Sequence, residues 1–409
     1  MKGANRFRRS VKAASIIGTL LLLSAVGAQA QTWTVLHTFT GPEGAGPQAG
    51  LTMDQAGNLY GTTYNGGSTA GNCRFTSGCG VVFKMTRRGS DWTLTPLYKF
   101  SGPDGSNPAS RVILAPDGTL YGTTVYGGAF SNGVVFRLQP PATACKSVLC
   151  PWTETVVYSF TGGADGAYPT YGDLTVDRAG NIFGTTYTGG NTAGNCDGSA
   201  PGCGVVFELS PSGRGWTENV LHTFQWDDGA FPYAGVIFDS HGHIFGTTEA
   251  GGTSVGGVIY ELTPSGSGWT ETVLHNFSDF GEDGGQAYGG LISDSSGNLY
   301  GATSVGGQNS GGEAYELSPS NGGWTFNLLY GFNAYQGTLA SLAMDSSGNL
   351  YGTLFIGAPE IFRLTPSNGQ YNLTGFTGSA GNDPYGNMIL DSAGNLYGTA
   401  GNVVFEITP

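Results

Sequence analysis

Short runs of alternating apolar and polar residues follow one another from about residue 33 to the end of the chain, separated by Gly, Pro, Asn and Asp. Such alternation over four to eight residues is typical of half-buried strands, and the separating residues are typical of turns. One run, Gly-Asn-Leu-Tyr-Gly-Thr-Thr and its variants, occurs seven times. The copies begin at Gly57, Gly118, Gly180, Gly242, Gly297, Gly348 and Gly394. A pattern that returns at this period indicates a repeat architecture.

Each repeat contains four strand signals. In the first copy these are an apolar run at 51–54, the Asn-Leu-Tyr-Gly-Thr run at 58–62, Val-Val-Phe at 81–83, and a segment from Trp92 to Phe100. Seven repeats of four strands predict an all-β fold, a seven-bladed β-propeller with four antiparallel strands per blade. One blade cannot bury both of its faces, so we expect Tyr60 and its equivalents to pack between blades.

The two ends of the repeat region carry complementary strand types. The segment 33–39 has the pattern of a fourth strand, whereas the chain ends after 403–407, which has the pattern of a third strand. The last blade therefore lacks an outer strand of its own. We predict that the N-terminal strand completes it and closes the ring, which leaves no unpaired edge.

The composition supports this fold class. The 409 residues include 72 Gly and 19 Pro, only 11% are charged and 12% are aromatic. So much Gly is common in disordered chains, but a disordered chain lacks the large apolar side chains that form a core.

Residues 1–30 have the features of a secretory signal peptide. Five basic residues precede an apolar stretch, and Ala28-Gln29-Ala30 is an A-x-A cleavage site. The alternative is an uncleaved membrane anchor, although the apolar stretch is shorter than the ~20 residues that a bilayer span needs. We therefore predict 31–409 to be a single propeller domain with no membrane span, secreted to the periplasm or the exterior.

The net charge limits the partners. Without residues 1–30, which hold five basic side chains and no acidic one, the chain has 11 basic and 29 acidic residues, a net charge of −18. Nucleic-acid binding requires a basic surface that replaces counterions, so we expect no nucleic-acid partner. We expect a monomer that uses no cofactor and binds a neutral or cationic ligand.

Six cysteines form three pairs that are close in sequence. Because exported proteins meet an oxidising environment, we predict local disulfides rather than metal sites, which usually require C-x-x-C spacing or nearby His. The predicted bridges are Cys73–Cys79, Cys145–Cys150 and Cys196–Cys203.

The repeated G-N-L-Y-G-T-T, G-G and G-V-V-F elements resemble the GloVer tandem repeats of bacterial exported "choice-of-anchor" proteins. The resemblance covers residues 33–409. It implies a β-propeller-like exported protein and carries no catalytic motif. The sequence differs from this family at Thr408-Pro409, where no apolar tail follows, so we expect release rather than surface attachment.

The His residues and the repeated Asp are best explained by structure. Three His share one position in the fourth strand with Tyr in other repeats, which favours packing over catalysis. His241 and His243 lie in a turn, where a solvated pair is favoured over a metal site, and we predict no metal. The Asp of the D-x-x-G turns, such as Asp54, can accept backbone N–H bonds and fix the turn.

Loops that connect one blade to the next combine Asp-Gly pairs with aromatic residues. Carboxylates beside aromatic rings can bind sugars, because the rings stack on the sugar face and the carboxylates accept hydroxyl hydrogen bonds. The candidate ligand-binding residues are Asp165, Tyr168, Tyr171, Asp228, Phe231 and Tyr233. The alternative is that these residues only form turns and seal adjacent blades.

These observations predict an exported binding or scaffold module. The sequence does not specify its ligand, and the candidates are a polysaccharide or another cell-surface molecule. The alternative is a glycan- or peptide-active lyase or hydrolase with its site at one mouth of the central channel. No catalytic motif is visible, and repeated carboxylates are poor catalysts because catalysis needs groups in distinct environments. Non-repeating polar groups that converge at one mouth would indicate a specific site.

Overall fold

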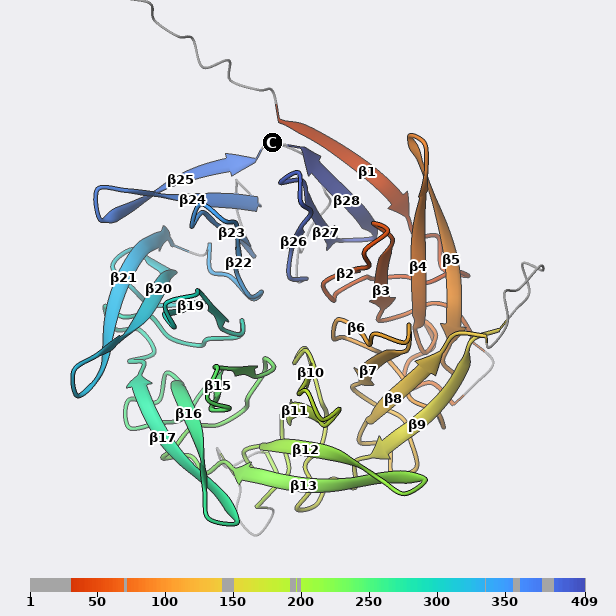
Figure 1. The fold of residues 1–409 in the computed structure, drawn as a ribbon, viewed down its shortest axis with the longest axis horizontal. Coiled ribbons are helices and arrows are strands. Elements are labelled where there is room, and N and C mark those ends of the chain that lie inside the picture. Colours follow the sequence, from red (N-terminus) through yellow and green to blue (C-terminus); the bar gives the residue numbers. More distant parts are fainter. Residues whose placement is uncertain are drawn as a thin grey trace, which may run out of the picture. The chain divides into compact units, whose positions relative to one another are not determined.

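The computed structural model of the protein describes residues 31–69, 72–141, 151–191, 196, 200–334, 336–355, 361–376 and 386–408. These residues form 28 strands in seven four-stranded antiparallel sheets. The sheets are the blades of a seven-bladed β-propeller, which confirms the predicted fold (Figure 1). The predicted signal peptide lies outside the described residues. No described segment is a helix long and apolar enough to cross a membrane.

The strands follow the same order in every blade. The innermost strands are β2 (Thr52–Met53), β6 (Ile113–Leu114), β10 (Thr175–Val176), β14 (Ile237–Phe238), β18 (Ile292–Ser293), β22 (Ala343–Met344) and β26 (Ile389–Leu390). The second strands are β3 (Leu59–Thr63), β7 (Leu120–Thr124), β11 (Ile182–Thr186), β15 (Ile244–Thr247), β19 (Leu299–Ala302), β23 (Leu350–Thr353) and β27 (Leu396–Ala400). The third strands are β4 (Val81–Arg88), β8 (Val134–Gln139), β12 (Val205–Ser212), β16 (Val258–Ser265), β20 (Ser310–Ser320), β24 (Ile361–Ser367) and β28 (Val403–Thr408). The outer strands are β5 (Asp91–Lys99), β9 (Thr153–Ser159), β13 (Gly215–Thr223), β17 (Gly268–Asn276), β21 (Gly323–Asn333), β25 (Gln370–Phe376) and β1 (Thr32–Thr38).

The ring closes through its two ends, as predicted. Strand β1 is the outer strand of the blade that contains β26, β27 and β28, and it pairs with β28 in antiparallel register from Thr32↔Thr408 to Thr38↔Val403. Figure 1 shows β1 and β28 side by side although they come from opposite ends of the sequence. The N-terminal segment therefore removes an exposed edge from the last blade.

The hydrophobic core lies between neighbouring blades. Tyr60 is buried with Val112, Leu120 and Phe136 of the next blade, and the same arrangement recurs around the ring. The Gly that follows each of these aromatic residues is required for close packing. A Cβ at Gly61 would lie 2.6 Å from Phe83 of the third strand, so that ring takes the space a side chain would use.

Two kinds of connection define the two faces of the ring. Short D-x-x-G turns join the first and second strands, and the Asp side chain caps the turn. Asp54 accepts hydrogen bonds from the backbone N–H groups of Ala56 (2.9 Å) and Asn58 (2.8 Å) and from the Tyr60 hydroxyl (3.1 Å). On the other face, the loops between blades pair with those after the second strands, for example through the Ala45↔Asn65 bridge.

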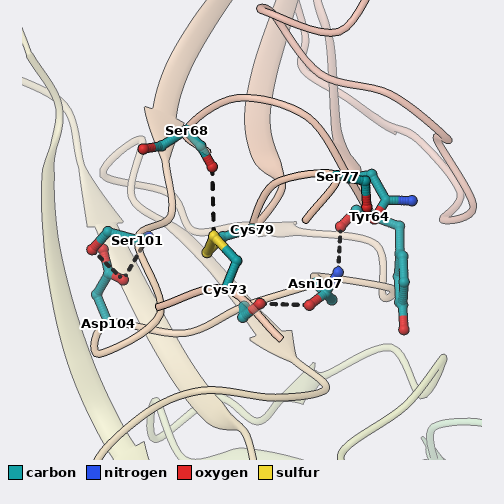
Figure 2. Close-up of a disulfide and its surroundings, with 10 residues drawn as sticks. Tyr64, Ser68, Cys73, Ser77, Cys79, Ser101, Asp104 and Asn107 are labelled. Carbon is teal, nitrogen blue, oxygen red and sulfur yellow. Dashed lines mark hydrogen bonds between the residues drawn. A yellow bond between two sulfur atoms is a disulfide. The ribbon is translucent and has the colours of Figure 1, made fainter. Parts of the chain in front are cut away.

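Disulfides lie in the loops of this second face. Cys73–Cys79 and Cys196–Cys203 are both formed, as predicted, whereas Cys145–Cys150 lies outside the described residues. The Cys79 carbonyl accepts the backbone N–H of Asn107 in the next blade (2.7 Å), and the Asn107 side chain donates to the Tyr64 carbonyl (2.9 Å). Figure 2 shows this bridge beside Tyr64 and Asn107. The bridge thus fixes a loop that supports the adjacent blade.

Candidate ligand-binding site

The two predicted carboxylates, Asp165 and Asp228, are held within their own loops. Asp165 accepts hydrogen bonds from the Thr161 backbone N–H (2.8 Å) and the Tyr158 hydroxyl (3.0 Å). Asp228 accepts the Gln225 backbone N–H (2.7 Å) and lies 3.3 Å from His222 Nε2. These bonds give each carboxylate a structural role in the loop.

The same pairing recurs between the outer strand and the loop that follows it. A Tyr or His at one position of the outer strand contacts the acid of that loop. The pairs are Tyr98–Asp104, Tyr158–Asp165, His222–Asp228, His275–Asp283 and His37–Glu43. The sequence pattern predicts that this His or Tyr side chain packs in the structure. In three of the pairs the side chain also hydrogen-bonds the loop carboxylate, and His37 and His222 lie 3.7 Å and 3.3 Å from theirs.

The four predicted aromatic residues lie in ring contacts on this face. Tyr171 and Tyr233 are stacked with centroids 4.9 Å apart, and Tyr233 meets Tyr288 edge to face at 5.0 Å. Phe231 stacks on Tyr187 at 5.0 Å. Tyr168 instead contacts Tyr126 of the preceding blade at 5.5 Å. The structure therefore brings Tyr171, Phe231 and Tyr233 together and places Tyr168 in a neighbouring group.

A cavity of about 390 Å³ occupies the channel at the centre of the ring. Gln48, Tyr171 and Tyr288 lie on its wall, together with residues that precede the innermost strands. The Tyr171 hydroxyl, from the third blade, donates to Gln48 Oε1 of the first blade at 2.7 Å. At the equivalent position the second blade has Ala109, whose short side chain leaves room for this bond.

Polar side chains from several blades meet in the channel. Arg111 Nε lies 3.0 Å from Asp173 Oδ2, and the Arg111 backbone N–H donates to Asp173 Oδ1 at 3.0 Å. From another blade, Asn387 Nδ2 donates to Asp173 Oδ2 at 3.2 Å. Asn387 Oδ1 accepts the Ser341 N–H (2.7 Å), and Ser341 Oγ accepts the Gly290 N–H (2.8 Å). One network of hydrogen bonds thus links residues of five blades.

All members of this network occupy the same position of the repeat, immediately before the first apolar residue of the innermost strand. The seven residues at this position are Gly50, Arg111, Asp173, Gly235, Gly290, Ser341 and Asn387. Gly235 is required there, because a Cβ would lie 2.0 Å from the Asp173 carbonyl oxygen. Sequence reasoning did not single out these residues. Alignment of the seven repeats would have found them as a position where residue types diverge.

Glu249 is a second non-repeating group behind the aromatic wall. Its carboxylate accepts a hydrogen bond from the Tyr288 hydroxyl (2.8 Å), and the equivalent residue in the preceding blade is Tyr187. Burial raises the pKa of Glu249, and hydrogen bonds from the Tyr288 and Tyr187 hydroxyls partly offset that rise. Glu249 therefore orients the ring of Tyr288 at the cavity wall.

The two turn His residues are tied to nearby acids. Both backbone N–H groups, of His241 (2.8 Å) and His243 (2.9 Å), donate to Asp239 Oδ1, and His243 Nδ1 lies 2.8 Å from Glu261 Oε1. Among the described residues, no group of three or more His, Cys, Asp or Glu side chains is arranged to hold a metal ion.

The cavity lining thus combines two tyrosine rings with a guanidinium, a carboxylate, an amide and a hydroxyl. Apolar walls with a few fixed polar groups are typical of small-molecule sites. The protein is thus a repeat β-propeller with a candidate site in its channel.

The sequence comparison identifies the family. Residues 13–196 and 153–360 match the family model of the Gloeobacter/Verrucomicrobia repeat. The chain therefore belongs to that family, as the repeated motifs indicate. No curated protein sequence matches the chain.

Several solved structures share the fold at low sequence identity. A streptogramin B lyase structure is 13% identical over 92% of this chain and 97% of its own, with a TM-score of 0.57. The extracellular domain of a protein designated a hybrid two-component system from B. thetaiotaomicron is 13% identical over 91% of this chain and 41% of its own, with a TM-score of 0.52. The WD40 β-propeller domain of Doa1 is 11% identical over 92% and 97%, with a TM-score of 0.53. At these identities the likeness concerns the fold.

Proposed function

We propose that the protein is an exported binding module that holds a carbohydrate in the channel cavity. The observation that carries the proposal is the convergence of Arg111, Asp173, Ser341 and Asn387, four non-repeating polar residues, on a cavity walled by tyrosine rings.

The chemistry of the wall suits a sugar. The faces of Tyr171 and Tyr288 can cover the C–H surface of a pyranose ring, and the opposite network offers donors and acceptors to its hydroxyl groups. Burial raises the pKa of Tyr288 and Tyr233, so their hydroxyls remain protonated donors at neutral pH. In this proposal Asp165 and Asp228 hold the loops, Tyr171 lines the cavity, and Tyr233 and Phe231 pack behind it against Tyr171 and Tyr187.

Export of residues 31–409 as one domain is part of the same proposal. The two formed disulfides require an oxidising compartment to persist, and one fold neighbour is named as an extracellular domain. Both observations are consistent with secretion.

The test is a panel of neutral and acidic polysaccharides screened against the purified mature protein, followed by calorimetry on any that is retained. Arg111→Gln removes a donor from the cavity and should weaken binding about tenfold, equivalent to about 1.4 kcal/mol. Arg178→Gln is the matched control, because Arg178 is exposed in a D-x-x-G turn on the other face. Failure to bind any polysaccharide, or equal effects of the two variants, would refute the proposal.

An enzyme that cleaves the same ligand is the second candidate. The charged pair of Arg111 and Asp173 in the channel is the observation that favours it, because unique charged groups at a channel mouth also suit catalysis. The same panel separates the two functions: an enzyme releases shortened products during incubation, whereas a binding module returns the polysaccharide unchanged.

A further inference from the structure

Aromatic side chains continue outward from the cavity across the loop face of blades 1 to 3. Phe75, within the Cys73–Cys79 loop, lies 6.3 Å from Tyr64 and 6.0 Å from Tyr126 between ring centroids. Tyr126 in turn contacts Tyr168 at 5.5 Å. We call Tyr64, Phe75, Tyr126 and Tyr168 the outer aromatic group.

Tyr64 joins this group to the cavity wall. Burial raises the pKa of Tyr64, and the neighbouring hydroxyls of Tyr126, to which it is hydrogen-bonded, and of Tyr171 raise it further. Tyr171 belongs to the wall of the channel cavity and stacks on Tyr233. Tyr64 therefore lies between Tyr126 of the outer aromatic group and Tyr171 of the cavity wall, and we call these rings together the aromatic surface.

A second hollow of about 430 Å³ lies at the outer end of this surface. Its lining includes Arg74, Pro103 and Tyr126, and the Arg74 guanidinium carbon lies 4.2 Å from the centroid of the Tyr126 ring. Phe75 beside it is 41% exposed. Exposed aromatic surface in a fixed position is typical of an interaction site.

The backbone holds these rings at a conformational cost. Tyr168 has φ of 56° and Phe231 has φ of 59°, both in the left-handed region that bulky residues seldom adopt. The preceding loop fixes each of them, because Tyr168 N–H donates to the Asn132 carbonyl (2.9 Å) and Phe231 N–H donates to the Cys203 carbonyl (2.9 Å). Asn107 and Gln286 have nearly the same φ at the equivalent position of other blades, so the repeated turn sets where these rings stand.

We propose that the ligand is a neutral polysaccharide chain that occupies the channel cavity with one end and runs over Tyr64 to the hollow at Arg74 and Phe75. This inference rests on the proposed carbohydrate function and extends it from a single sugar to a chain. Charge favours a neutral polysaccharide chain, because the mature protein carries a net charge of −18 and would repel an anionic one. Arg74 is the charged side chain that lines the hollow, and its guanidinium lies over the Tyr126 ring.

The experiment uses oligosaccharides of increasing length from the polysaccharide that the panel identifies. Affinity should rise with length until the chain spans both hollows, and then become constant. Phe75→Ala and Arg74→Ala should each weaken the binding of long oligosaccharides about fivefold, because each removes a stacking contact of about 1 kcal/mol, and should leave the shortest one unaffected. Tyr288→Ala, at the cavity, should weaken all lengths.

Phe280→Ala is the control, because Phe280 is 77% exposed on the loop between blades 4 and 5. Both Phe75 and Arg74 are exposed, so their substitution should leave the fold intact, and thermal melting checks this. If affinity does not depend on oligosaccharide length and short sugars still bind at the cavity, the inference of a polysaccharide chain is wrong, whereas the proposed carbohydrate function stands. Binding of an apolar peptide but of no polysaccharide would overturn both.

Discussion

Three glutamates at the junctions between blades should make the stability of the propeller depend on pH. Glu154 of β9, Glu218 of β13 and Glu271 of β17 occupy the same position of the outer strand. In each, burial raises the pKa of the carboxyl group to about 7, and a nearby loop aspartate of the preceding blade adds to the rise. For Glu271, the neighbouring His222 lowers the pKa in part.

The direction of the effect follows from the protons bound in each state. In the unfolded chain these carboxyl groups have an ordinary pKa near 4.5, so between about 4.5 and 7 the folded protein binds more protons than the unfolded chain. The stability that these groups contribute is therefore complete below pH 4.5 and is lost as the pH rises through 7. A neutral glutamine in their place would keep that stability at every pH.

The free energy that each glutamate contributes is smaller than its pKa shift alone indicates, because solvent screens its charge. A rise from 4.5 to about 7 corresponds to about 3 kcal/mol per group at full desolvation. The side chains are only half-buried, so solvent screens the charge and about 1 kcal/mol per group is a better value. Three groups together give about 3 kcal/mol, a substantial part of a typical unfolding free energy of about 5–15 kcal/mol.

Urea unfolding of the wild type and of the triple variant Glu154→Gln, Glu218→Gln, Glu271→Gln at pH 5 and pH 8 measures this contribution. The difference between the two proteins isolates the glutamates from other titrating groups. Burial lowers the pKa values of His37 and His275. These two groups act in the opposite direction, because the stability that they contribute to the protein is lost as the pH falls below 6.5. The triple variant should gain about 3 kcal/mol over the wild type between pH 5 and pH 8.

The control is Asp91→Asn, since Asp91 is exposed in the outer strand β5, and this variant should differ from the wild type by the same amount at both pH values. A triple variant whose advantage does not change between pH 5 and pH 8 would refute the reasoning. So would a triple variant that is less stable than the wild type at pH 8, because the glutamates would then act as favourable charges.

Three further predictions concern single features of the fold. Tyr315→Phe should stabilise the protein by about 1 kcal/mol in urea unfolding. The buried Tyr315 hydroxyl has no hydrogen-bond partner among the described residues, and five other repeats have Phe at this position. A loss of stability would show that the hydroxyl is hydrogen-bonded. Deletion of 31–40 should lower the melting temperature sharply, because it removes β1 from the last blade, and an unchanged melting temperature would contradict the closure. Replacement of both Cys196 and Cys203 by Ser should weaken saccharide binding while the propeller stays folded, because the Cys203 carbonyl fixes the backbone of Phe231. Equal affinity of variant and wild type in calorimetry would show that this disulfide does not support the binding site.

The sequence by itself was enough to determine the repeated part of this protein. Tyr60 and Phe83 recur in every blade as aromatic residues because every blade has the same two faces to bury. The alternation of apolar and polar residues identifies the strands, and the mismatch between the first and last strand types identifies the closure. The turn aspartates follow as well, because their hydrogen bonds reach only two to six residues along the chain.

Hydrogen bonds between side chains slightly farther apart in the sequence could not be predicted from the alternation of residues. Both Tyr158 and Asp165 stand out in the sequence, one as part of a repeated strand position and the other as a loop acid. Their hydrogen bond depends on how the chain turns between them, which the alternation of residues does not specify.

Only the tertiary structure decided where the candidate site lies. Arg111 and Asp173 are 62 residues apart, and Asp173 and Asn387 are 214 apart, so no local pattern connects them. They meet because closure of the ring brings the residues that precede every innermost strand to one channel. A repeat determines its own strands through local alternation, but a contact across the axis exists only when all seven blades are in place.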